Sequence, residues 1–72
     1  MLYNFLNDDY KIDFPLPPAL KELVEKAEKF DKENNYGMYL LYSEEIWVSA
    51  KNCTVTGELT KREWDILSAR FL

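Results

Sequence analysis

Apolar residues recur along much of the chain at the spacing of an amphipathic helix. Between Pro18 and Asn34 they fall on a single helical face, at Leu20, Leu23, Val24, Ala27 and Phe30. Proline is accepted in a first helical turn because the N–H that it lacks would be unpaired there. Asn34 tolerates the left-handed conformation that ends many helices. We predict a helix over 18–34, with its lysines and glutamates forming a solvated face.

Residues 36–56 are rich in β-branched and aromatic residues, so two structures compete. A hairpin at 38–56 would turn near Ser43-Glu44-Glu45, which are poor turn formers, and no Asn-Gly or Asp-Gly pair is present. The helical pattern fits better, because one face collects Tyr39, Tyr42, Ile46, Ala50 and Cys53. We predict a helix over 36–56 that ends at Gly57, and an α+β fold with a hairpin remains the alternative.

The clearest local signal lies near the end of the sequence. Thr60 precedes an apolar run and Glu63 follows three positions later, which is the pattern of a capping box. Leu59 and Trp64 stand where a hydrophobic staple requires them. We predict a third helix over 60–72, with Trp64, Leu67 and Phe71 on its buried side.

Residues 1–17 have a different pattern. Apolar and polar residues alternate from Tyr10 to Leu16, which indicates an extended backbone, and three prolines reinforce it. This segment is either an arm laid across the helices or a strand lent to the sheet edge of a partner. The fold prediction is an all-α, small three-helix bundle over 18–72 with an extended N-terminal arm over 1–17, in a single domain.

The helix over 36–56 has more apolar residues than one buried face needs. Leu41, Val48 and Val55 recur at a spacing of seven on its far side, with Met38 nearby. Either the arm covers them through Leu2, Tyr3, Phe5, Ile12 and Phe14, or another protein chain does. We predict that Met38, Leu41, Val48 and Val55 form a partner-binding surface.

Composition limits the chemistry that the chain can perform. It has 72 residues, of which 47% are hydrophobic, and it has no histidine and one cysteine, Cys53. No intramolecular disulfide is therefore possible, a structural zinc site is effectively excluded, and we expect no cofactor. The net charge of −4 is spread along the chain without a basic patch, which argues against nucleic-acid binding.

The first residues of the sequence and the length of its apolar stretches suggest where in the cell the protein is located. The start MLYNFLNDDYK has no basic region followed by an apolar run, so it is not typical of a signal peptide. No stretch approaches the roughly 18 apolar residues that a membrane span requires. We expect a cytoplasmic protein without a membrane partner.

Catalytic groups are not apparent, so we predict that the protein is not an enzyme and has no small-molecule substrate. The neighbouring acids Asp8-Asp9 and Glu44-Glu45 are interpreted as solvated, and Cys53 lacks an activating base. The run from Asp31 to Tyr42 departs from a calcium loop, because Tyr36 stands at its sixth position and Tyr42 at its twelfth.

Two resemblances to known proteins accompany these patterns. Residues 57–72 (GELTKREWDILSARFL) are similar to the short C-terminal SHOCT motif, which implies a role in oligomerisation. The order LPPALKEL, EKAEKFD and then a tyrosine-rich helix resembles short uncharacterised proteins of Gram-positive bacteria and their mobile elements. The second resemblance implies a bacterial protein and no particular activity.

The sequence therefore predicts a small acidic protein–protein interaction module, such as a regulator or inhibitor that docks on another protein. A structural homo-oligomer, for example a homodimer built by two copies of helix 36–56, is the first alternative. A nucleic-acid-related or nucleic-acid-mimic role is the second. It would require Lys61, Arg62 and Arg70 on one face, or carboxylates at phosphate-like spacing.

Overall fold

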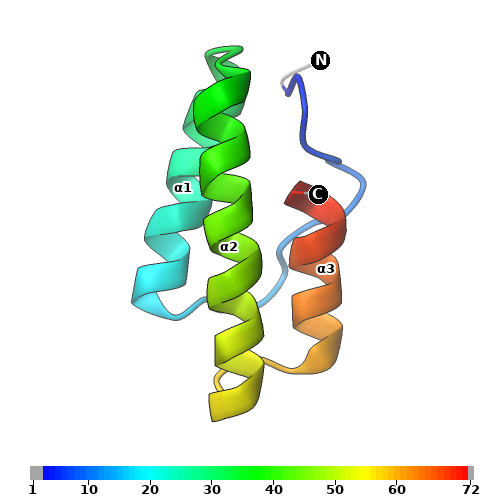
Figure 1. The fold of residues 1–72 in the computed structure, drawn as a ribbon. Helices are drawn as coiled ribbons and strands as arrows, with labels where there is room; N and C mark the ends of the chain where they lie inside the picture. Colours follow the sequence, from blue (N-terminus) through cyan, green and yellow to red (C-terminus); the bar gives the residue numbers. More distant parts are fainter. Residues whose placement is uncertain (1–2, 72) are drawn as a thin grey trace.

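The computed structural model describes residues 3–71 and contains three helices (Figure 1). They are α1 (Pro18–Lys32), α2 (Tyr36–Thr56) and α3 (Lys61–Phe71). Within 3–71 no residue is in a strand, so the hairpin alternative is wrong. The all-α three-helix fold with a non-helical N-terminal arm is confirmed.

The helix ends follow from local backbone chemistry. α1 ends at Lys32, before the predicted Asn34, because Asn34 itself adopts the left-handed conformation with φ 58°. The Asn35 side chain then accepts a hydrogen bond of 3.3 Å from the backbone N–H of Met38 at the start of α2. Gly57 ends α2 with φ 86°, as predicted. Leu72, the predicted end of the last helix, lies outside the described residues.

The capping box of α3 forms as predicted. The N–H of Thr60 donates to Oε1 of Glu63 at 2.9 Å, and the N–H of Glu63 donates to Oγ1 of Thr60 at 3.2 Å. Leu59 is buried and Trp64 packs partly against the core. These contacts fix the start of α3 immediately after the turn that leaves α2.

α2 is the central element of the molecule. It packs against both α1 and α3, which lie on either side of it (Figure 1). The core lies behind α2, between the three helices and the arm, and consists of Leu6, Leu20, Val24, Ala27, Tyr39, Ile46, Ala50, Leu59, Leu67 and Phe71. The side of α2 turned away from this core therefore has no other element of the described chain over it.

The arm fills the space between α1 and α3. Leu6 is buried in the core, and the ring of Phe5 lies 5.0 Å from that of Tyr36 and 5.2 Å from that of Tyr39. Farther along, Ile12, Phe14 and Leu16 pack against the core while the residues between them are exposed. The predicted alternation is thus observed from Ile12 to Leu16, whose apolar side faces the core, whereas Tyr10, predicted on the same side, is 45% exposed.

Candidate interaction surface on α2

The outer stripe of α2, defined as Leu41, Val48 and Val55, is open to solvent. Their exposed fractions are 50%, 51% and 81%. Met38, predicted to join them, is half-buried. The idea that the arm covers this stripe is wrong, because Tyr3, Phe5, Ile12 and Phe14 pack against the core on the other side of α2. Leu2 lies outside the described residues.

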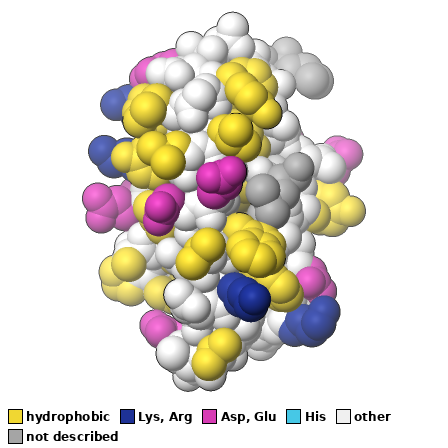
Figure 2. Space-filling view, in the orientation of Figure 1, with side chains coloured by type: hydrophobic (Ala, Val, Ile, Leu, Met, Phe, Trp, Pro, Cys, Tyr) yellow, Lys and Arg dark blue, Asp and Glu magenta, His cyan; other side chains and the backbone are white. Residues whose placement is uncertain are grey.

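A second apolar row runs along the same open side of α2, next to α3. It consists of Tyr36, Leu40 and Trp47, which are 55%, 40% and 36% exposed. The ring of Trp47 lies 6.0 Å from that of Trp64, so this row continues to α3. Figure 2 shows hydrophobic side chains at several levels of this face from top to bottom, with acidic groups near mid-height, a basic group below them, and further charged groups toward the edges. Seven large apolar residues, including Tyr10 of the arm, are exposed in the described chain, a concentration typical of interaction sites.

Charged residues interrupt the open side of α2 at two levels. Glu44 and Glu45 are exposed near the middle of the helix, and Lys51 is exposed farther along. The ammonium of Lys51 lies 5.4 Å from the ring centroid of Trp47, which places it toward α3. Within residues 3–71 these three side chains form no ion pair. Their charges are therefore available to another molecule.

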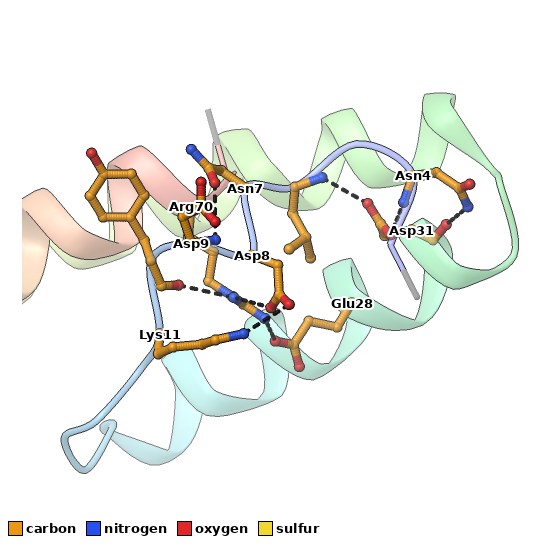
Figure 3. A network of polar contacts seen from close by, with 10 residues as sticks. Asn4, Asn7, Asp8, Asp9, Lys11, Glu28, Asp31 and Arg70 are labelled. Atoms are coloured by element: carbon orange, nitrogen blue, oxygen red, sulfur yellow. Dashed lines mark hydrogen bonds and ion pairs between the residues drawn. The ribbon is translucent and has the colours of Figure 1, made fainter. Parts of the chain in front are cut away.

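Asp31 explains why the arm lies behind α2. Its carboxylate is fully buried and accepts hydrogen bonds from three consecutive backbone N–H groups: Asn4 at 2.7 Å, Phe5 at 2.7 Å and Leu6 at 2.9 Å. Figure 3 shows Asn4 beside Asp31 with the bond between them. Bonds to a charged acceptor are stronger than neutral ones. The end of α1 thereby holds the arm against the core, away from the outer stripe.

Arg70 of α3 forms the second attachment of the arm. Its guanidinium donates to Glu28 at 2.8 Å, to Asp8 at 3.2 Å and to the carbonyl of Tyr10 at 2.9 Å (Figure 3). Burial alone would lower the pKa of Arg70, but its hydrogen bonds to Glu28 and Asp8 raise it. The pKa of Asp8 is lowered, mainly by its hydrogen bond with Lys11, against a smaller effect of burial. This network joins α1, α3 and the arm.

Sequence reasoning missed both attachments. The sequence predicts Glu28 and Asp8 as solvated charges, whereas both bind Arg70. A signal was present, because Asp31 continues the spacing of the buried positions Leu20, Val24 and Ala27 in α1. A charge on an apolar stripe indicates a buried, partnered side chain.

The basic residues required for a nucleic-acid site do not share a free surface. Arg70 is 5% exposed and paired with carboxylates. Lys61 lies 3.6 Å from Asp65, and Arg62 lies 3.5 Å from Asp13. The described surface offers no cluster of free basic groups from these three residues.

Groups capable of other chemistry are scattered. No three histidine, cysteine, aspartate or glutamate side chains among residues 3–71 are placed to hold a metal ion. Burial, with a smaller contribution from Glu58, raises the pKa of the Cys53 thiol, which disfavours the nucleophilic thiolate. None of the helices α1–α3 combines the length and apolarity of a membrane span.

Comparisons with family models, with curated proteins and with solved structures find no match for this chain. The resemblances noted in the sequence therefore stay predictions. The outer stripe of α2 and its flanking charges are the features on which a functional proposal can be built.

Proposed function

We propose that this chain is a protein–protein interaction module that docks through the open side of α2. The observation that carries the proposal is the exposure of the outer stripe on the central helix. A monomer that exposes three aliphatic side chains in register, beside a second apolar row, leaves a few hundred Å² of apolar surface in water. Burying that surface against another protein supplies the free energy of association.

The rest of the molecule supports this role. Gly57 ends α2, the capping box starts α3, and the attachments of the arm join α1 and α3, so the two helices that flank α2 are held in place. A rigid helix loses little conformational entropy when it binds, so more of the hydrophobic free energy remains as affinity. The module is therefore a preformed helix face for docking on another protein.

The test compares capture by tagged wild-type protein with capture by Val48→Glu. Val48→Glu places a charge in the middle of the outer stripe and should weaken binding by at least about tenfold, because that carboxylate loses its water in the complex. The matched control is Ala19→Glu, which adds the same charge at an exposed position in the first turn of α1.

The measurement is capture from lysate of the organism that encodes the chain, with an untagged copy added. The captured species is then purified and its affinity remeasured. A stoichiometric protein, or the untagged copy, held by wild type and Ala19→Glu but not by Val48→Glu supports the proposal. Equal capture by all three proteins, or recovery of chaperones alone, contradicts it.

A further inference from the structure

We infer that the occupant of the outer stripe is a second copy of this chain, bound with its α2 antiparallel and with the two-fold axis at Val48. This inference rests on the proposed docking role of α2 and names the partner. It follows from the order of apolar and charged residues along the exposed side of the helix.

The apolar residues are symmetric about Val48. Leu41 and Val55 each lie seven positions away, which is about 10.5 Å along the axis at 1.5 Å per residue. In an antiparallel pair centred at Val48, each Leu41 therefore meets Val55 of the second copy and the two Val48 side chains meet each other. A two-fold interface requires this self-complementarity, in which the same surface serves both partners.

The charges agree with the same arrangement. At about 100° per residue, Glu44 and Lys51 lie on the same side of the stripe, roughly 40° and 60° from Val48. Glu44 is about 6 Å before Val48 and Lys51 about 4.5 Å after it. Reversing the second helix brings each Glu44 to the level of Lys51 of the other copy, within about 1.5 Å along the axis.

Two ion pairs thus form on the α3 side of the interface. On the opposite side Glu45 meets Asn52 of the other copy, and an amide can donate to a carboxylate. These side chains are exposed, and Glu44, Glu45 and Lys51 form no ion pair within residues 3–71, so pairing across the dimer breaks no ion pair of the monomer.

A parallel pair is disfavoured by the same residues. Parallel alignment about the stripe brings Glu44 of one helix next to Glu45 of the other, twice, and leaves Lys51 opposite Asn52. Four carboxylates would then gather at one level beside an apolar contact. Like charges at such flanking positions disfavour association and set the orientation of helix pairs.

The contact area sets the expected affinity. One 21-residue helix and its flanking side chains bury less than the roughly 800 Å² per partner of a typical stable interface. The dimer should therefore have a Kd on the order of 10 μM, in the range of weak, specific interfaces.

Sedimentation equilibrium of the full chain with charge-reversal variants tests the pairing. Glu44→Lys or Lys51→Glu alone should weaken the dimer about tenfold, and the double variant Glu44→Lys/Lys51→Glu should restore it, because the reversed charges again oppose each other. Both substituted positions, Glu44 and Lys51, are exposed, and circular dichroism verifies that each variant stays folded. Single variants that match wild type, or a double variant weaker than both single variants, would overturn the inference.

Cysteine cross-linking tests the direction in a Cys53→Ser background. Val48→Cys should form a disulfide-linked dimer, Leu41→Cys alone should not, and a mixture of Leu41→Cys with Val55→Cys should cross-link. A Leu41→Cys homodimer overturns the antiparallel arrangement.

The two proposals fail in different ways. A chain that stays monomeric at about 1 mM, with capture of another protein that depends on Val48, overturns the dimer and leaves the docking function standing. If the chain dimerises with a Kd that Val48→Glu leaves unchanged, the two copies do not pair through the outer stripe. That result overturns the proposed α2 dimer and removes the support for α2 docking.

Discussion

Asp31 shows how a single charged side chain can position a whole segment. Three backbone N–H groups of the arm point at its carboxylate, and none of them is provided with a helical or strand partner. The side chain of Asn4 adds a fourth link by donating to the carbonyl of Asp31. A single side chain of α1 therefore holds the arm on the core side of α2.

Replacing Asp31 tests this attachment. Asp31→Asn removes the charge and one acceptor oxygen, leaving at least one buried N–H unsatisfied, and should lower the free energy of unfolding by about 2–4 kcal/mol. Urea denaturation measures the change, with Asp9→Asn at an exposed position as the matched control. Equal stability of the two variants would show that the Asp31 carboxylate does not hold the arm.

The ionisation of Asp8 should make the free energy of unfolding depend on pH. Its pKa in the folded state lies below the ordinary value of 3.8, mainly because Lys11 donates to it. The unfolded state then binds more protons as the pH falls through this region, so the stabilisation is present above pH 3.8 and is lost below it. Urea denaturation is measured across about pH 2.5–6. The free energies of unfolding of wild type and Asp8→Asn, plotted against pH, should converge at the acidic end. Parallel curves would contradict the prediction.

At the scale of elements, each helix is limited by residues that suit its ends. Gly57 takes φ 86°, which an L side chain rarely adopts, and the neighbouring N–H of Glu58 bonds back to the carbonyl of Cys53 at 2.8 Å. Gly37 lies inside the first turn of α2 with no atom within 4 Å of where a Cβ would be. The backbone at Gly57 therefore favours a residue without a Cβ, whereas the backbone and surroundings of Gly37 would accept an alanine.

Alanine substitutions at these glycines should change stability in opposite directions. Gly57→Ala should cost about 1 kcal/mol because the left-handed backbone is strained by a Cβ. Gly37→Ala should stabilise by about 0.5–1 kcal/mol, since it reduces the entropy of the unfolded chain at an open helical position. Thermal unfolding followed by circular dichroism resolves both shifts. A stabilising Gly57→Ala would contradict the assigned helix end.

At the scale of the molecule, the position of α2 in the middle of three helices creates both the core and the exposed surface. α1 and α3 pack on its flanks and the arm closes the rear, so the front is left open (Figure 1). Ile46 and Val48 are two positions apart in the sequence and lie on opposite sides of α2, at 1% and 51% exposure. A single helix thus serves folding on one side and, as proposed, docking on the other.

Truncation of these two residues separates the roles. Ile46→Ala should lower the free energy of unfolding by about 2–5 kcal/mol, because it removes buried methyl groups and leaves a cavity. Val48→Ala should change it by less than about 0.5 kcal/mol in the monomer. Denaturation is measured at low micromolar concentration, where self-association contributes little. A large loss of stability in Val48→Ala would mean that the outer stripe is buried in the monomer.

Much of the fold could be predicted because its signals are local. The spacing of apolar residues in α1, the capping pattern of Thr60 and Glu63, and the glycine after α2 act through neighbouring backbone groups. The β-branched residues of α2 favoured a strand locally, and the helix prevailed because its apolar face matches the core. The outer stripe could also be predicted, because Leu41, Val48 and Val55 recur every seven residues.

The spacing of apolar residues in the sequence was enough to predict the three helices, a non-helical arm before them and two apolar sides on α2. Which of those sides the arm covers became clear from the contacts between elements. That choice depends on Asp31 and Arg70, whose partners lie far away along the chain, at Asn4, Phe5, Leu6 and Asp8. Periodicity describes one element at a time, whereas hydrogen bonds between elements select how they are assembled.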